Sequence, residues 1–224
     1  YDDLYNADFK LKFLMQIIVA KILTDQGYVI SNYHGLFGLY EVPWLLAQLS
    51  TIFIFLVVVN AINFIDGIDG LAITEVLKII LLIEFFSDGL TALAPLGMLV
   101  MATILPLYYF NFKKKRKVFL GDGGSMLLGS LVMIYVLNML GDSFIFKTEL
   151  RLNKTLFSVL ILLYPLTDLL RVFIVRIKDQ KSPFVADKGH LHHLLNKKFK
   201  PSISLLTIVL LELILFALVA KILV

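Results

Sequence analysis

Two aspartates, each followed by glycine, lie in the stretch Asn60-Ala61-Ile62-Asn63-Phe64-Ile65-Asp66-Gly67-Ile68-Asp69-Gly70-Leu71-Ala72. Asp66 and Asp69 are three residues apart, so they lie on one side of a helical turn, and Asn63 offers a further oxygen ligand. Mg²⁺ suits one or two protein oxygens completed by water and substrate phosphate. A charged side chain is costly beside apolar membrane segments, which predicts a functional site here. The alternative is a pair of Asp-Gly turns that separate two helices.

A second candidate phosphate loop is Phe119-Leu120-Gly121-Asp122-Gly123-Gly124-Ser125, which follows the basic run Lys113-Lys114-Lys115-Arg116-Lys117 and opens an apolar segment. Glycines allow the backbone to approach a phosphate closely, and the free amides at a helix start favour anions. Asp122 would then hold a cation that bridges this phosphate. The alternative is that Asp122 only caps a helix. The basic run itself is typical of a topology determinant that contacts anionic lipids.

An acidic pair opens the chain, since Asp2 and Asp3 precede every apolar segment and Lys12 follows nine residues after Asp3. The pair could act as a base or hold a cation, and the Lys12 ammonium could pair with a phosphate. The alternative is an exposed acidic loop.

A cationic group follows the sixth apolar run, where Arg171 and Arg176 precede the histidines His190, His192 and His193. His190 and His193 share a helical face, as zinc ligands do, but no further soft ligand is near in the sequence. Phosphate binding by imidazole and guanidinium groups is therefore preferred to zinc. His34 lies far from this group and is expected to be structural.

The chain is too hydrophobic for a soluble domain, because 59% of its 224 residues are hydrophobic and its mean hydropathy is +0.87. A bilayer core needs ~20 apolar residues per helix. The apolar runs predict an all-α polytopic membrane bundle, one integral-membrane domain over 1–224, with about seven spans at 11–30, 44–63, 71–87, 90–111, 123–141, 155–177 and 203–224. No cysteine is present, which excludes disulfides and thiolate metal ligands.

Two of the segments carry additional information. The span 71–87 contains Glu75, Lys78 and Glu84, which predicts that it packs inside the bundle. The connection from Gly27 to Pro43 alternates in character and predicts a small hairpin at one membrane face.

Basic residues set the orientation of a membrane protein. With Asp2 in the cytoplasm, the parity of the spans places four segments on the cytoplasmic side: 1–10, 64–70, 112–122 and 178–202. With the adjoining helix ends, they hold 14 of the 21 Lys and Arg residues and nine of the 12 Asp residues, while all five Glu residues lie elsewhere. Hard-cation and phosphate chemistry explains this sorting of Asp from Glu, so the active site is expected to face the cytoplasm, with 178–202 as a His-containing loop.

These motifs resemble those of the polyprenyl-phosphate N-acetylhexosaminyl-1-phosphate transferases, the glycosyltransferase 4 family. Residues 60–72 are similar to its NAxNxxDGxDGLA signature, and residues 119–125 to its GDxGS loop. Asp2-Asp3, with Lys12 and Gln16, resembles the acidic pair and the helix after it.

The loop His190–Leu195, preceded by Ser182-Pro183-Phe184 and Asp187, resembles the HxHH loop of the branch that uses UDP-N-acetylglucosamine or related UDP-sugars. The four motifs occur in the family's order over about 200 residues. Family members have about three or four further helices before the acidic pair. The resemblance, with the opening Tyr1-Asp2-Asp3, therefore predicts that this stretch belongs to a larger bacterial inner-membrane protein of about ten or eleven helices.

The resemblance implies that a sugar-1-phosphate passes from a UDP-sugar to undecaprenyl phosphate with Mg²⁺ or Mn²⁺, giving UMP and a lipid-linked sugar that starts a cell-envelope glycan. It implies the following roles: Asp122 as a direct metal ligand helped by Asn63 and Asp66; Asp2, paired with Asp3, as the base or a covalent nucleophile; Asp69 as a nucleotide contact or loop anchor; Lys12 and Asn60 as substrate-binding residues; and Arg171, Arg176, His190, His192 and His193 as ligands of the UDP-sugar diphosphate. The expected partners are these substrates and membrane lipid, without nucleic acid, and a homodimer is compatible with them.

Alternatives stay open at this point. The phospho-N-acetylmuramoyl-pentapeptide transferase branch differs in the last loop. An ion- or proton-coupled transporter could use Asp66, Asp69 and Asp168 as a relay, although transporters place such residues near the midplane. A catalytically inactive scaffold would not be expected to retain a competent residue at every motif position. The identity of the UDP-sugar, the glycan pathway and the choice between single and double displacement stay open too.

Overall fold

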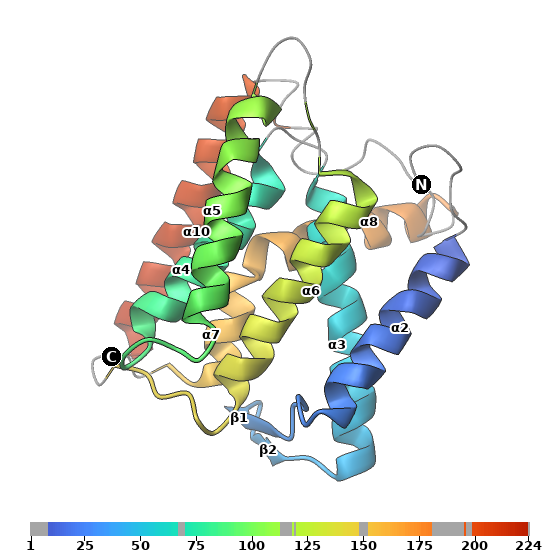
Figure 1. Ribbon diagram of the computed structural model, residues 1–224, viewed down its shortest axis with the longest axis vertical. Helices are drawn as coiled ribbons and strands as arrows, with labels where there is room; N and C mark the ends of the chain where they lie inside the picture. Colours follow the sequence, from blue (N-terminus) through green and yellow to red (C-terminus); the bar gives the residue numbers. More distant parts are fainter. Residues whose placement is uncertain are drawn as a thin grey trace.

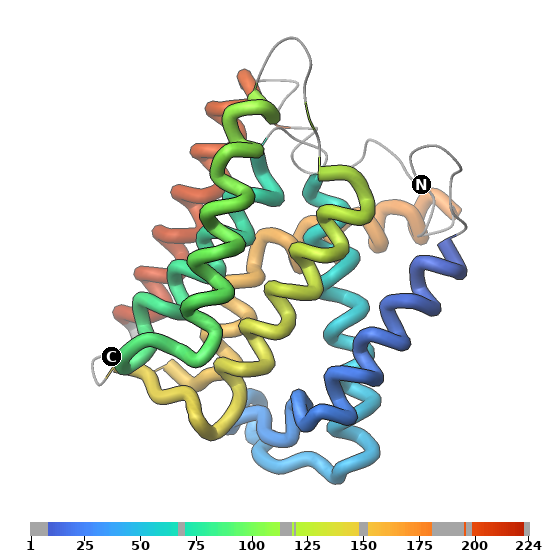
Figure 2. The backbone as a smooth tube through the Cα atoms, in the orientation of Figure 1, coloured from blue at the N-terminus to red at the C-terminus, as the bar shows by residue number. Residues whose placement is uncertain are grey.

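The protein is a helical bundle in which helices run between two ends of the molecule (Figure 1). The computed structural model describes residues 9–66, 70–112, 118, 120–147, 152–180, 195 and 199–223. The helices are α2 (Phe9–Asp25), α3 (Trp44–Ile65), α4 (Leu71–Phe86), α5 (Ala94–Asn111), α6 (Gly121–Leu140), α7 (Lys154–Ile161), α8 (Leu163–Lys178) and α10 (Pro201–Leu223). A hairpin of β1 (Asn32–Leu36) and β2 (Leu39–Glu41) joins α2 to α3 at the lower end of the view (Figure 2).

Four of the helices in the described ranges are long and apolar enough to cross a membrane: α3, α5, α6 and α10. A fifth span results if α7 and α8 are counted as one bent span. The remaining helices, α2 and α4, have 17 and 16 residues. The prediction of a helical membrane protein is therefore confirmed, and four or five of the about seven expected spans meet these criteria.

The predicted span 155–177 differs from the structure in one respect. It consists of two helices, α7 and α8, that meet at Leu162 with a bend of 67°. Pro165 lies in the first turn of α8, where its missing N–H is tolerated, so the proline marks the start of the new helix. Hydropathy alone cannot report this change of direction, because both halves are apolar.

The centre of the bundle is the packing of α3 against α6. Val59 and Ile62 of α3 are completely buried, and they meet α6 at Gly129. A β-carbon on Gly129 would lie 2.9 Å from the Val59 Cα atom, so glycine is required for this close approach. This contact fixes the two helices whose ends carry the aspartates of the two motifs.

The end of α3 and the start of α4 lie at the opposite end of the bundle from the hairpin (Figure 1). Helix α3 ends at Ile65, and Gly70 precedes α4 in the left-handed conformation with φ +79°. A β-carbon there would lie 2.6 Å from the Phe112 ring of the segment after α5. The predicted helix break is thus present between Ile65 and Leu71, and Gly70 packs against the end of α5.

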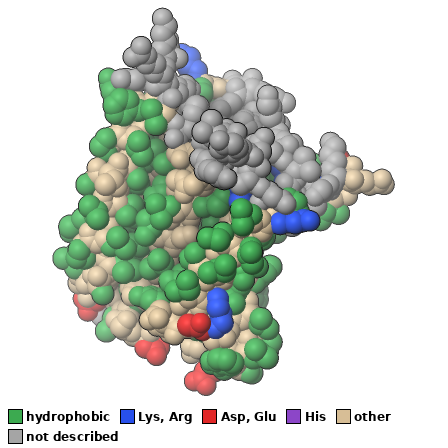
Figure 3. Space-filling view, turned by 45° about the vertical axis from the view of Figure 1, so that its right-hand side comes forward, with side chains coloured by type: hydrophobic (Ala, Val, Ile, Leu, Met, Phe, Trp, Pro, Cys, Tyr) green, Lys and Arg blue, Asp and Glu red, His purple; other side chains and the backbone are tan. Residues whose placement is uncertain are grey.

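The expected burial of the 71–87 segment and the expected hairpin are both confirmed. Glu75 is fully buried, and the Lys78 side chain is 8% exposed. The hairpin is antiparallel, with Asn32 paired to Glu41. Many large hydrophobic side chains are exposed on the described helices, and they are spread over the described part of the face seen in Figure 3. This surface suits a helical protein surrounded by lipid.

Candidate active site at the ends of three helices

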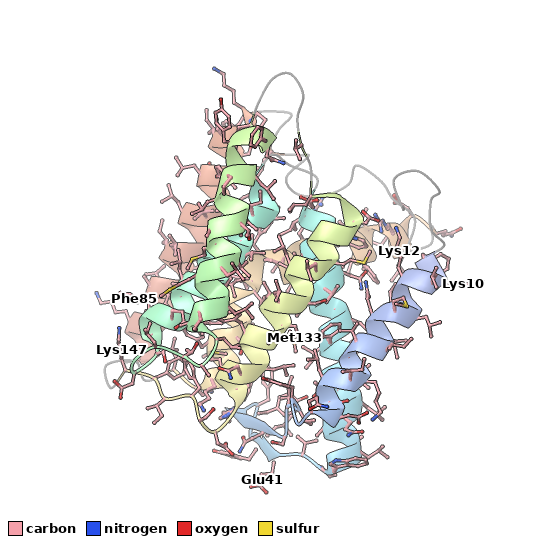
Figure 4. All side chains as sticks on the ribbon, viewed as in Figure 1. Lys10, Lys12, Glu41, Phe85, Met133 and Lys147 are labelled. Carbon is pink, nitrogen blue, oxygen red and sulfur yellow. The ribbon has the colours of Figure 1, made fainter. Side chains whose placement is uncertain are left out.

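The candidate site lies where the start of α2, the end of α3 and the start of α6 approach one another. Lys12 lies near the start of α2 (Figure 4), and its Nζ atom is 2.5 Å from Oδ2 of Asp122 in the first turn of α6. The two side chains are 25% and 42% exposed. The ion pair is therefore accessible to a ligand and unites two residues that are 110 positions apart.

Asp122 is the second residue of α6, and Leu120 occupies the N-cap position without a side-chain cap. The helix-capping alternative for Asp122 is therefore wrong. The first N–H groups of a helix lack intrahelical partners and carry the positive end of the helix dipole, so they favour anions such as phosphate. A carboxylate in this turn can bind a cation next to the same groups.

Asn63 joins the site through a hydrogen bond from α6. Its Oδ1 atom accepts from the Ser125 Oγ atom at 2.6 Å, and Ser125 is completely buried. The same hydroxyl lies 2.9 Å from the carbonyl oxygen of Gly121. Ser125 therefore orients the Asn63 amide oxygen relative to the turn that carries Asp122.

Asp66 directly follows α3, and its carboxyl group interacts electrostatically with that of Asp122. Burial, together with the smaller effect of the negative charge on Asp122, raises the pKa of Asp66 to about 7. Two carboxyl groups close together repel each other when both are ionised, and a cation would relieve this repulsion. The electrostatics of the site thus favour either a proton or a cation at Asp66.

Asn60 lies about one helical turn before Asn63 on α3, and its side chain contacts α2. Its Nδ2 atom donates to Oε1 of Gln16 at 2.8 Å, and Nε2 of Gln16 donates to the Met126 sulfur at 3.5 Å. Gln16 is 6% exposed. This chain of contacts holds α2, α3 and α6 in register directly beneath the Lys12–Asp122 pair, which suggests a supporting role for Asn60.

Arg176 reaches the signature stretch from α8. Its guanidinium carbon is 5.7 Å from the centroid of the Phe64 ring, and only 2% of Arg176 is exposed. This geometry is a cation–π contact. Asp168 is also buried on α8, and Arg171 and Asp168 lie close enough to Tyr164 to act on it electrostatically. Arg176 is therefore the α8 residue that the structure brings to the motif, whereas Arg171 lies nearer the start of the helix.

A cavity of about 330 Å³ opens between α2 and α6, beside the ion pair. Lys12 and Asp122 contribute its polar side, and its walls are mostly apolar, including Met15, Val19 and Leu127. A polar head group bound at the ion pair would place an attached hydrocarbon chain against these side chains.

Several predicted site residues lie outside the described part of the chain: Asp2, Asp3, Asp69, His190, His192 and His193. Of the described candidates, the structure brings together Lys12, Asn63, Asp66 and Asp122. The supporting roles of Gln16, Phe64 and Ser125 were not predicted. Gln16 and Ser125 fall within the motifs, but only the spatial partners reveal what each side chain does.

The described donors fit a magnesium-type cation. Across the described ranges, no three His, Cys, Asp or Glu side chains are grouped as a metal cluster. Asp122 and Asp66 supply carboxylate oxygens, and Asn63 supplies an amide oxygen held by Ser125. A cation that takes few protein ligands and completes its shell with water and phosphate matches this set.

The sequence comparisons agree with the motifs. Residues 1–140 match the model of glycosyl transferase family 4, a span that includes both aspartate motifs and Lys12. The chain belongs to glycosyl transferase family 4. The predicted resemblance to this transferase family is thereby confirmed, and a transporter is not supported.

Relatives from three bacteria cover most of the chain. A "probable undecaprenyl-phosphate N-acetylglucosaminyl 1-phosphate transferase" of Bacillus subtilis is 31% identical over 200 residues, covering 86% of this chain and 52% of the relative. A "decaprenyl-phosphate N-acetylglucosaminephosphotransferase" of Mycobacterium leprae is 33% identical over 213 residues, with 86% and 52% coverage. An "undecaprenyl-phosphate alpha-N-acetylglucosaminyl 1-phosphate transferase" of Salmonella typhi is 28% identical over 204 residues, with 86% and 53% coverage. The chain thus spans about half the length of these relatives.

Proposed function

We propose that the full-length protein transfers N-acetylglucosamine-1-phosphate from its UDP-sugar to undecaprenyl phosphate, releasing UMP and starting a lipid-linked cell-envelope glycan. The family membership and the names of the relatives support the reaction class and the substrates. N-acetylglucosamine is preferred over other N-acetylhexosamines because the relatives' names specify it.

One observation carries the proposal for the lipid acceptor. The Lys12–Asp122 pair lies at the polar side of a cavity whose walls are mostly apolar. A polyprenyl phosphate has the same division, with an anionic head and a hydrocarbon chain. Lys12 would pair with a phosphate of the lipid, while residues such as Met15 and Leu127 would contact its first isoprene units.

We propose that Asp122, Asn63 and Asp66 hold the divalent cation, Mg²⁺ or Mn²⁺. When bound, this ion neutralises the diphosphate and lowers the energy of the developing charge on the leaving phosphate. Asp122 is the strongest candidate because it is accessible, next to the free amides of α6 and close to Asp66. Ser125 keeps the Asn63 oxygen turned toward the same turn.

The chain's own residues perform the positioning on which phosphoryl transfer depends. Arg176, held on Phe64, is suited to bind a phosphate of the nucleotide sugar, and Lys12 is suited to bind that of the lipid. An oxygen of the lipid phosphate attacks the β-phosphorus, a new phosphorus–oxygen bond forms, and the bond between the β-phosphorus and the bridging oxygen breaks. The electron pair stays on the departing UMP.

The roles of the other predicted residues remain predictions. Asp2 and Asp3 would supply the base, Asp69 would contact the nucleotide or hold its loop, and the histidines His190, His192 and His193 would bind the diphosphate.

We propose that α2 and α4 also cross the membrane, which gives seven spans with the α7–α8 pair counted once. With a rise of ~1.5 Å per residue, their 17 and 16 residues extend for ~25 Å, close to the thickness of the bilayer core. The protein would lie in the bacterial inner membrane with its active site facing the cytoplasm, as the bias of Lys and Arg residues predicts.

The test uses full-length protein in detergent with UDP-N-acetylglucosamine, undecaprenyl phosphate and Mg²⁺. Release of UMP and formation of the lipid diphosphate sugar are expected, and omission of either the lipid or the metal should stop both. A panel of UDP-N-acetylhexosamines then identifies the preferred sugar. Absence of UMP with every sugar and with both Mg²⁺ and Mn²⁺ would refute the proposal.

A further inference from the structure

A cluster of three buried ionisable residues joins α4 to α10 within the bundle. The Nζ atom of Lys78 lies 2.5 Å from Oε2 of Glu75 and 2.7 Å from Oε2 of Glu212. The three side chains are 8%, 0% and 8% exposed. Buried charges are costly and require well-defined partners, so the cluster commits these residues to one arrangement.

Glu212 also contacts the break between α7 and α8. Its second carboxylate oxygen, Oε1, accepts a hydrogen bond from the backbone N–H of Tyr164 at 3.0 Å. Tyr164 is the second residue of α8, and the N–H groups of a first helical turn have no intrahelical acceptor. Within a membrane bundle such a group needs a protein partner, and Glu212 supplies it.

The anchored helix carries Arg176 at its other end. From Tyr164 to Arg176, twelve residues of helix extend for ~18 Å. Because α8 meets α7 at 67°, the contact at its first turn helps determine the direction in which α8 leaves the break. That direction decides whether Arg176 lies on Phe64, within the signature stretch at the end of α3.

We propose that Glu212, held in place by Lys78 and Glu75, is a positioning residue that aims α8 and thereby places Arg176 for binding the nucleotide-sugar diphosphate. The kinetic part of this inference rests on the proposed function, because it assigns Arg176 to that substrate. The structural part, that the Glu212 carboxylate on α10 fixes the start of α8, does not depend on the proposed function.

Three substitutions of Glu212 distinguish an effect on the direction of α8 from a general loss of stability. Glu212→Gln retains one oxygen at the same reach, which can still accept from Tyr164. Its NH2 group replaces the oxygen that pairs with Lys78, and Lys78 keeps its contact with Glu75. Glu212→Asp keeps the charge but is one methylene shorter, which draws the acceptor away from Tyr164. Glu212→Leu removes the acceptor altogether.

The Glu212→Gln variant should therefore be the most active of the three, Glu212→Asp should be less active, and Glu212→Leu the least active. In UMP-release assays, the KM for the UDP-sugar should stay within about twofold of wild type for Gln. For Leu this KM should rise and kcat/KM should fall by about tenfold or more, because a displacement near 1 Å can cost a hundredfold in rate. The KM for undecaprenyl phosphate should not change. A function of Asp equal to or above that of Gln would overturn the proposal, since charge and not the reach of the acceptor would then matter.

A matched control is Glu84→Leu. Like Glu212, the α4 residue Glu84 accepts a hydrogen bond from a backbone N–H group, that of Thr91, at 3.2 Å. Thr91, however, lies in the segment before α5 and not in α8. Its loss should lower thermal stability without a change in the KM for the UDP-sugar. In addition, Glu212→Leu should raise the KM for the UDP-sugar little further when Arg176 is already replaced by Gln. The effects of two residues that act through the same contact are not additive. Full additivity of the two losses would contradict the link.

A measurement without substrate distinguishes failure of this inference from failure of the proposed function. Paired spin labels at Ile174 of α8 and Phe53 of α3, both exposed, report the direction of α8. These 224 residues contain no cysteine, so within them the labels attach only where cysteine is introduced. A distance distribution that shifts or broadens with Asp or Leu at position 212, but not with Gln, supports the proposal even if no UMP is released. An unchanged distribution in all three variants would overturn it, and if the Leu variant does not fold, the comparison of Gln with Asp decides.

Discussion

Ser125→Ala isolates the contribution of a side chain that supports the proposed metal ligands from α6. Ser125 is completely buried, and its hydroxyl donates to Asn63 Oδ1 at 2.6 Å. Alanine is nearly the same size, so the substitution removes the hydrogen bond without opening a large cavity. The oxygen of Asn63 would then lose the group that orients it.

The size of the effect follows from the type of contact. Loss of a hydrogen-bonding partner behind a metal ligand typically weakens metal affinity by 10- to 100-fold, and tenfold corresponds to ~1.4 kcal/mol. The same hydrogen bond contributes only about 1 kcal/mol to folding, equivalent to a Tm change of roughly 2–4 °C in a protein of this size. A large change in metal requirement with a small change in stability is therefore expected.

The assay is the rate of UMP release as a function of Mg²⁺ concentration. For Ser125→Ala the concentration giving half-maximal rate should rise at least tenfold, and excess Mg²⁺ should restore much of the rate. Ser130→Ala is the matched control on the same helix, because its hydroxyl donates to the Met126 carbonyl oxygen at 2.9 Å. An unchanged Mg²⁺ requirement in Ser125→Ala would refute the assignment of Asn63 to the metal site.

Three further predictions address other parts of the molecule. Lys12→Met should raise the KM for undecaprenyl phosphate by about tenfold while stability falls by at most ~1 kcal/mol, as for other partly exposed ion pairs; an unchanged KM would contradict its role. Arg176→Lys keeps the charge but loses the planar group that lies on Phe64, so kinetics should show a several-fold higher KM for the UDP-sugar, with a normal KM for the lipid; equal changes in both would argue against this assignment. Burial lowers the pKa of His34, whose Nδ1 atom lies 3.1 Å from Thr155 Oγ1. Below pH ~6.5, the unfolded state therefore binds more protons than the folded state. The free energy of unfolding should fall as the pH drops through this range. Thermal unfolding in detergent at about pH 7.5 and 5.5 should show this loss, and it should be smaller in His34→Gln; an equal loss in the variant would exclude His34 as its source.

The helical membrane architecture and the break in the signature stretch could be predicted from sequence because both depend on local composition. Long apolar runs specify the spans, and the tandem Asp-Gly sequence specifies the end of α3 before Gly70. The parity of the spans also predicted that Asp66 and Asp122 would share one end of the bundle, and the structure brings them together. Their chemical roles remain predictions.

Other features could not be predicted, because they depend on contacts between distant segments. The bend at Leu162 is hidden within a continuous apolar run, and only Pro165 hints at it. The Lys78–Glu212 contact joins residues 134 positions apart, so the sequence could predict that Lys78 is buried but could not identify its partner on α10. The pairing of Asn63 with Ser125 likewise required the close approach of α3 and α6.

The most direct test of the central claim compares Asp122→Asn with Asp142→Asn in the full-length protein. Both aspartates are near the ends of α6, but Asp142 is exposed just after the helix, away from Lys12. With UDP-N-acetylglucosamine, undecaprenyl phosphate and Mg²⁺, we predict that the Asp142 variant releases UMP at the wild-type rate and that the Asp122 variant, equally well folded, releases none. Unchanged UMP release by Asp122→Asn would contradict the account of this site.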